Sequence, residues 1–113
     1  MQEIGQLSLD IIQTKTEIII LAPLAGVSAK EVTITVTDET LTIKGIRPNP
    51  VLTDEKDYLT KECFWGEFER SIILPENVDA KNIQASSVNN ILEIRIPKTS
   101  EAKTKVVKIN IDK

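Results

Sequence analysis

The residues that most often do chemistry in enzymes are sparse in this chain. It contains no histidine and a single cysteine, Cys63. Without histidine, no Ser-His or Cys-His pair can activate a nucleophile and no imidazole can bind a metal. One cysteine cannot build a thiolate zinc cluster. We therefore expect neither a metal nor a cofactor.

Carboxylates are the remaining candidates for acid–base chemistry. Glu67 and Glu69 have the spacing of one strand face, and Asp54 lies three residues before Asp57 in a polar segment. Solvated side chains on a strand or in a loop explain both pairs. The four glycines are scattered and form no phosphate-binding loop. The chain is therefore predicted not to be an enzyme.

The composition is typical of one domain with one core. The chain has 113 residues, of which 41% are hydrophobic, and its net charge of −3 disfavours nucleic acid as a partner. The longest apolar run, 18–24, contains Pro23 and is too short to cross a membrane. No secretory signal is present and a lone cysteine fits a reducing compartment, so we expect a cytoplasmic protein.

The hydrophobic pattern predicts β-strands. Apolar side chains recur at every second position in several segments, and no window of similar length has the 3.6-residue period of a helix. These segments are 7–11, 32–36, 41–43, 68–74 and 92–96. The run 18–21 is apolar on both faces, which predicts a central or doubly covered strand. Seven or eight short strands predict an all-β, immunoglobulin-like antiparallel β-sandwich.

Turn-forming residues mark the ends of these strands. Ser28 stands three residues before Glu31, the spacing of a capping box, so one helical turn is expected there. Residues 79–82 can form a second such turn. Asn89-Asn90 predicts a tight type I′ hairpin, because asparagine tolerates positive φ.

Two segments do not fit a sandwich core. The loop 47–66 contains two prolines and an acidic cluster, and loops of this length in compact domains are often functional. After Pro97 the chain becomes polar and basic, and near its end Ile109 and Ile111 continue an apolar alternation. We divide the chain into a domain at 1–97 and a flexible C-terminal extension at 98–113.

Four segments in order resemble the small heat-shock protein (α-crystallin) family, in its bacterial and plant form. They are Leu24-Ala25-Gly26 with the following Lys30-Glu31-Val32, the segment 65–75 (WGEFERSIILP), the segment 85–98 with Asn89-Asn90 and Ile96-Pro97-Lys98, and Ile109-Asn110-Ile111. Ala25 replaces the usual proline and Asn90 the usual glycine. The resemblance spans about residues 7–111.

The resemblance implies an α-crystallin domain that acts as an ATP-independent holdase chaperone, binding unfolding polypeptides and preventing their aggregation. It implies a groove between 32–36 and 83–88 for a partner's tail or a client, with Ile109 and Ile111 as the tail-latch motif. The groove residues are Val32, Ile34, Val36, Ile83 and Ala85. Ordinary packing in the sandwich core is the alternative role for these residues.

The resemblance also implies self-association, as a dimer formed by loop exchange and as a higher oligomer formed through the tail. An extra strand near 57–62 would pair with the partner's segment 7–12, and Arg70 would neutralise a loop carboxylate or remain a surface arginine. The implied interface residues are Leu7, Leu9, Ile11, Tyr58, Leu59 and Arg70. Only six residues precede the first expected strand, so we expect modest protection of clients.

Two other functions remain open. A CS-type co-chaperone domain, which docks on a large ATP-driven chaperone, shares the sandwich but generally lacks the long loop and the Ile-x-Ile tail. A carbohydrate-binding sandwich usually needs several exposed aromatic residues, and this chain has only four, Tyr58, Phe64, Trp65 and Phe68.

Overall fold

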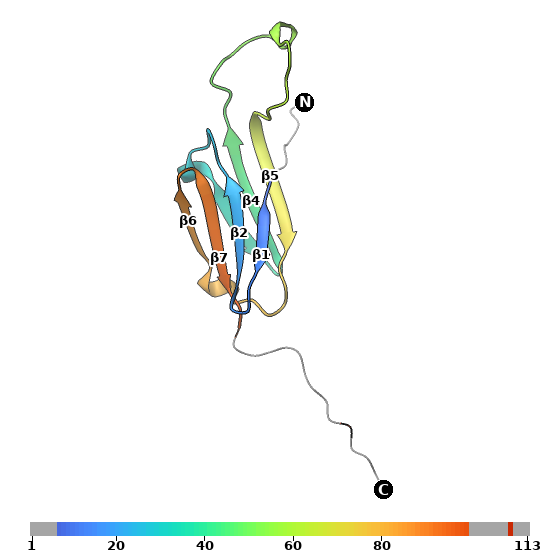
Figure 1. Ribbon diagram of the computed structural model, residues 1–113, viewed down its shortest axis with the longest axis vertical. Helices are drawn as coiled ribbons and strands as arrows, with labels where there is room; N and C mark the ends of the chain where they lie inside the picture. The colour runs from blue at the N-terminus through green and yellow to red at the C-terminus, as the bar shows by residue number, and fades with distance from the viewer. Residues whose placement is uncertain (1–6, 100–108, 110–113) are drawn as a thin grey trace.

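Two antiparallel sheets pack face to face in the computed structural model, which describes residues 7–99 and 109 (Figure 1). One sheet has the strand order β1-β2-β7-β6 and the other β3-β4-β5. The strands are β1 Asp10–Gln13, β2 Glu17–Pro23, β3 Thr33–Thr37, β4 Thr40–Arg47, β5 Gly66–Ile73, β6 Gln84–Val88 and β7 Ile91–Pro97. The predicted all-β sandwich is confirmed, with seven strands in the described residues.

Alternation of side chains along the central strands builds the core between the sheets. In β2 every second residue is buried, and Ile20 pairs with the equally buried Ile94 of β7. Leu41 and Ile43 of β4 close the core from the other sheet. The run 18–21 lies in a central strand, as predicted, but its outward residues are only half-buried because no third layer covers them.

The turns follow the predicted positions, with one difference in mechanism. Asn89 and Asn90 both have positive φ, 53° and 62°, as a type I′ hairpin requires. A 3₁₀ turn, η3 (Ala80–Asn82), begins after Asp79, whose side chain accepts a hydrogen bond from the Lys81 amide. A 3₁₀ turn η1 (Ala29–Glu31) also forms, but the Ser28 side chain makes no capping bond.

The first strand is shorter than the alternation predicts, and contacts of the domain reach slightly beyond Pro97. The first strand starts at Asp10 rather than near Leu7, whose side chain is buried in the core. Backbone hydrogen bonds to the domain continue beyond Pro97: the Thr99 amide donates to the Asn77 carbonyl at 2.8 Å. The division of the chain at residue 97 stays a prediction.

The upper end of the sandwich depends on a close approach between Gly45 of β4 and Phe68 of β5, which are paired in register. A Cβ atom at Gly45 would lie 2.5 Å from Cζ of the buried Phe68 ring. Arg47 stands over the same ring, 5.9 Å from its centroid, and its Nε donates to the Ala25 carbonyl at 2.7 Å. The glycine therefore allows the ring to lie across the strand.

Gly45→Ala is expected to lower the melting temperature by roughly 5 °C or more, because overpacking a core costs about 1–3 kcal/mol. Adding Phe68→Leu, which removes the clashing Cζ, should recover part of the loss relative to Phe68→Leu alone. Thermal unfolding monitored by circular dichroism measures both. If Gly45→Ala costs the same with and without the ring, the close approach is not the constraint.

Candidate functional site

Each sheet ends in strands that are paired on one side only. These edge strands are β1 and β6 in the larger sheet and β3 and β5 in the smaller one. The Arg70 guanidinium of β5 donates from Nη1 to the Leu7 carbonyl at 3.1 Å, which ties β5 to the segment that leads into β1. The other two edge strands, β3 and β6, therefore lie along the opposite side of the sandwich, as Figure 1 shows.

The side of the sandwich between β3 and β6 is incompletely closed. Ile34 and Val36 pair with the buried Ile43 and Leu41, so they face the interior, yet both remain partly exposed. Ala85 pairs with the buried Ile94 and also faces inward, but it is exposed. Apolar side chains that point inward are thus left in contact with solvent.

Small side chains on β6 explain this opening. Ala85 and Ser87 face inward, opposite Ile94 and Leu92, and both are small and exposed. Ile83, just before the strand, is larger and packs against the core together with Val32. We call Val32, Ile34, Val36, Ile83, Ala85 and Ser87 the open edge. Sequence reasoning missed Ser87, although its spacing of two from Ala85 could have indicated it.

The predicted interface residues fall into two separate groups. Leu7 is 3% exposed and packs in the core of its own chain, Leu9 is half-buried beside it, and Ile11 of β1 is 51% exposed. Arg70 joins this group through its bond to Leu7. Leu59 lies in the loop and is fully exposed. One chain therefore does not bring the two groups together, and their interface role stays a prediction.

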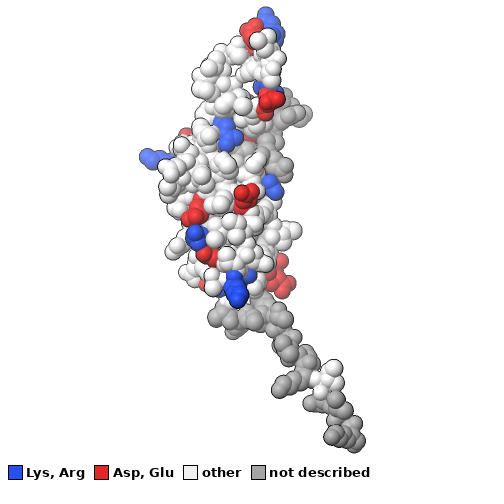
Figure 2. Space-filling view, in the orientation of Figure 1, with Lys and Arg blue, Asp and Glu red and all other residues white. Residues whose placement is uncertain are grey.

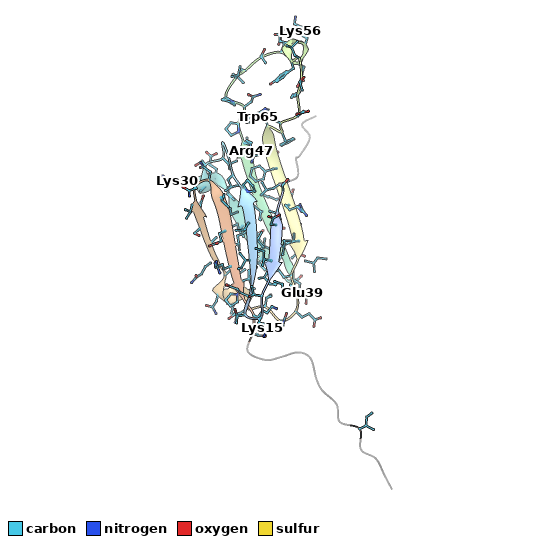
Figure 3. All side chains as sticks on the ribbon, viewed as in Figure 1. Lys15, Lys30, Glu39, Arg47, Lys56 and Trp65 are labelled. Atoms are coloured by element: carbon cyan, nitrogen blue, oxygen red, sulfur yellow. The ribbon has the colours of Figure 1, made fainter. Side chains whose placement is uncertain are left out.

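The loop 47–66 is held together by its own contacts. The Asn49 amide donates to the Tyr58 hydroxyl at 2.8 Å, and Lys61 pairs with Glu55 while standing 4.9 Å from the centroid of the Tyr58 ring. The hydrogen bond to Glu55 holds the pKa of Lys61 above its usual value. Figure 3 shows Trp65 near the base of the loop and Lys56 at its tip.

No strand forms at 57–62 within a single chain. A 3₁₀ turn, η2 (Glu55–Asp57), precedes irregular backbone instead. The tail-latch motif is only partly described: the Ile109 side chain is 86% exposed, and Ile111 lies outside the described residues.

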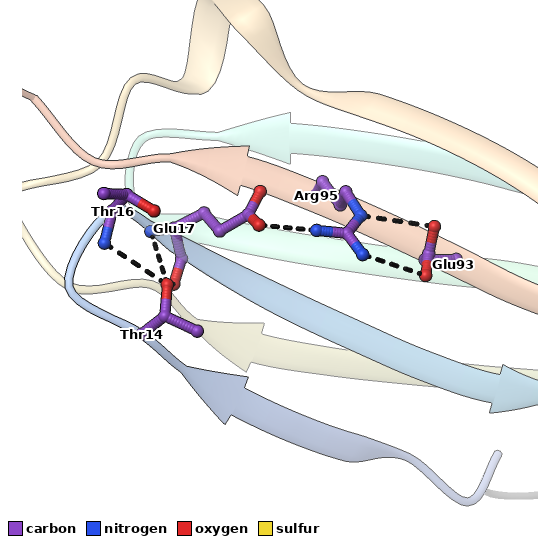
Figure 4. Close-up of polar contacts among 5 residues, drawn as sticks. All are labelled: Thr14, Thr16, Glu17, Glu93 and Arg95. Carbon is purple, nitrogen blue, oxygen red and sulfur yellow. Dashed lines mark hydrogen bonds and ion pairs between the residues drawn. The ribbon is translucent and has the colours of Figure 1, made fainter.

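The outward face of the larger sheet carries a charged cluster. Arg95 of β7 bonds to Glu93 on its own strand and to Glu17 on β2, and the bond to Glu93 contributes most to raising the arginine pKa (Figure 4). Figure 2 shows charges of both signs interspersed over the visible face. Exposed pairs of this kind contribute about 0–1 kcal/mol each, so we assign the cluster a minor structural role.

Two other kinds of site are absent from the residues that the structure describes. Across residues 7–99 and 109, no group of three or more Cys, Asp or Glu side chains is placed to hold a metal ion. The same part of the chain contains no helix long and apolar enough to cross a membrane.

Comparisons with a family model and with known sequences point to the same family. A sequence model of the Hsp20/alpha crystallin family matches residues 10–112. Small heat shock protein C4 of Rickettsia felis is 34% identical over 101 residues, covering 89% of this chain and 62% of that protein. A 17.8 kDa class I heat shock protein of Arabidopsis thaliana is 34% identical over 92 residues, covering 80% and 59%. The chain thus spans less than two thirds of both relatives.

Solved structures show the same similarity. The hspA protein of Xanthomonas axonopodis superposes with a TM-score of 0.77 at 29% identity, covering 90% of this chain and 100% of that one. A small heat-shock protein of Xylella fastidiosa, described as having a distinct high order structure, gives a TM-score of 0.75 at 25% identity, covering 93% and 96%.

Arg70→Ala is expected to loosen the segment that precedes β1. Losing a hydrogen bond from a charged donor lowers the free energy of local opening by about 1.5 kcal/mol or more. The backbone amides of residues 8–12 should therefore exchange hydrogen about tenfold faster. Arg95→Ala, which removes an arginine from the outward face of β7, is the matched control and should leave these amides unchanged. Equal exchange in both variants would contradict the anchoring role of Arg70.

Proposed function

Because this chain belongs to the Hsp20/alpha-crystallin family, we propose that it is an ATP-independent holdase chaperone that binds unfolding polypeptides and prevents their aggregation. The observation that carries the proposal is the open edge. There, apolar side chains such as Ile34 face inward but stay partly exposed, and the edge strands β3 and β6 each have backbone N–H and C=O groups on one side that pair with no other strand. An unfolding chain presents apolar side chains and unpaired backbone together, and strand addition satisfies both. The family match favours this function over a CS-type docking domain.

The C-terminal tail of a second copy is the proposed resting occupant of the open edge. Burying Ile109 and Ile111 contributes roughly 3–6 kcal/mol, at about 1.5–3 kcal/mol for each side chain. Ordering the tail and associating the chains offset much of this, so a single latch binds weakly, on the order of millimolar to micromolar. Such a latch can dissociate when clients accumulate, and several latches together build a higher oligomer.

The loop 47–66 is the proposed basis of the dimer. Leu59 is fully exposed in the single chain. Strand β1 is unpaired on one side, and its residues Ile11 and Ile12 are also exposed. Exchange of the loop between two copies would cover both apolar groups and complete the pairing of β1. We place the dimer in the cytoplasm, where Cys63 stays reduced.

The holdase activity predicts stoichiometric protection without nucleotide. Light scattering of two unrelated heat- or reduction-unfolded clients should fall as the chaperone ratio rises, because a holdase lowers the concentration of free unfolded chains by mass action. An inert albumin at the same mass concentration is the control. The proposal is wrong if a large molar excess gives no protection, and measurable binding to an ATP-driven chaperone would then support the CS-type alternative.

The latch predicts that filling the open edge blocks the tail. Ala85→Leu places bulk inside the edge, whereas Ser86→Leu places the same side chain on the outward face of the same strand. A peptide of residues 104–113 should bind Ala85→Leu at least tenfold more weakly than Ser86→Leu, measured by fluorescence anisotropy. Matching thermal unfolding of the two variants controls for folding. Equal affinity would show that the tail binds elsewhere.

A further inference from the structure

The edge strand β6 has very little side-chain burial (Figure 1). All five of its residues, Gln84–Val88, are exposed, and its only large apolar side chain, Val88, is 65% exposed. The other edge strands have buried anchors: β5 carries the buried Phe68, Ile34 of β3 packs against the core, and β1 follows the buried Leu7. Backbone pairing with β7 is therefore the main interaction that holds β6 in place.

Contacts outside the strand fasten both of its ends to the domain. Before β6, the Asp79 amide donates to the Pro97 carbonyl at 2.7 Å, and Ile83 packs against the core. After β6, the Leu24 amide donates to the Asn90 carbonyl at 2.6 Å. Residues 84–88 can therefore leave β7 while the segments on either side stay in place, which makes the opening local rather than global.

The inward face of β6 contributes little apolar contact to the strand that it covers. Ala85 pairs with the fully buried Ile94, and Ser87 pairs with the buried Leu92. Pairs of large apolar side chains across two strands are more stabilising than pairs that include alanine or serine. A strand with larger apolar residues at these two positions would bury more apolar surface on β7 than β6 does.

We propose that β6 detaches locally and that a segment of an unfolding polypeptide takes its place on β7, with apolar side chains at the positions of Ala85 and Ser87. The inference rests on the proposed holdase function and specifies how a client is held. Each backbone hydrogen bond between β6 and β7 is exchanged for one between the client and β7, so added apolar burial drives the exchange. Tail binding at the open edge, in contrast, leaves β6 in place.

The residues of β7 also define the class of client segment. Its inward positions lie opposite Leu92 and Ile94 and favour apolar side chains, whereas its outward positions lie beside Glu93 and Arg95 and accept polar side chains of either charge. The preferred segment therefore alternates apolar and polar residues. A folded protein keeps such strands paired, so only an unfolding chain offers one, and its apparent affinity scales with the fraction of chains in which β6 is detached.

A disulfide on the outward face can lock β6 without changing its inward face. In a Cys63→Ser background, Ser86→Cys with Glu93→Cys joins two directly paired residues of β6 and β7. The matched control, Thr35→Cys with Thr42→Cys, locks the edge strand β3 to β4 in the same way. Each oxidised protein is compared with its own reduced form, and thermal unfolding of the reduced forms confirms that the substitutions preserve the fold.

Hydrogen exchange tests the detachment. In the reduced β6 lock, the amides of residues 84–88 should exchange through local opening, and oxidation should slow them about tenfold or more. Oxidation of the β3 lock should leave these amides unchanged. Equal exchange of residues 84–88 in the oxidised and reduced β6 lock would overturn the proposal.

Two peptides of residues 83–89 test the replacement of the strand. One carries Ala85→Leu and Ser87→Leu, the inward pattern proposed for a client, and the other carries Gln84→Leu and Ser86→Leu, which places the leucines on the opposite face. By fluorescence anisotropy, the first should bind the reduced β6 lock about fivefold or more tightly than the second, and oxidation should abolish its binding. Equal affinities, or binding that survives the lock, would show that no strand is replaced.

Client protection separates this inference from the holdase function. With a heat-unfolded client, the oxidised β6 lock should protect about fivefold less per chain than its reduced form, and the β3 lock should protect equally in both forms. Full protection by the oxidised β6 lock would overturn the exchange and leave the holdase function standing. If the unmodified chain gives no protection, the holdase function fails, and hydrogen exchange and the peptides still decide whether β6 detaches and is replaced.

Discussion

A sandwich of two open sheets has four edge strands, and each edge carries backbone groups without a partner. A chain that remains soluble has to cover these edges, charge them or use them. This domain treats its two sides differently. On one side the Arg70 guanidinium bridges from β5 to the Leu7 carbonyl, so the segment before β1 is fastened to the opposite sheet. On the other side, the inward-facing Ala85 and Ser87 of β6 are small and remain exposed.

Leaving a side open is tolerable because the core does not depend on it. The fully buried side chains of Ile20, Ile94 and Ile43 belong to central strands that are paired on both sides. The edge residues Ile34 and Val36 pack against this core but stay partly exposed, so they contribute less to stability. A peptide can bind and leave at such an edge without disturbing the central strands, which is what a reversible binding surface requires.

Local patterns in the sequence were sufficient for the fold. Period-two alternation located the strands, and Asn89-Asn90 identified a hairpin because the positive φ of both residues is a local property. The predictions that were wrong concern positions where contacts outside the local sequence determine the structure. Leu7 continues the alternation of the first strand, but its side chain is in the core and pairing begins only at Asp10. The capping-box spacing at Ser28 gave a turn without its side-chain bond, because backbone contacts alone close so short a turn.

The candidate site was harder to predict, for a physical reason. Val32 and Ile34 have the same alternation as core residues, and the sequence does not show how far the opposite strand covers them. What leaves them exposed is the small size of Ala85 and Ser87, which matters only once β3 and β6 are known to lie along the same side. The family resemblance predicted that these two strands border one groove. Periodicity alone was equally consistent with ordinary packing of these residues in the core.

The proposed assembly follows from the weakness of each contact. A single tail in the open edge contributes too little to hold two chains together at low concentration, but several tails in one oligomer raise each other's effective concentration. Loop exchange acts at the opposite side of the sandwich, so it can hold a dimer together while the tails dissociate. In the proposed assembly Ile109 and Leu59 occupy separate surfaces, and the open edge can be released for a client without loss of the dimer. Ala85→Leu on β6 and a polar substitution at Leu59 in the loop should then alter different levels of assembly, with little coupling between them.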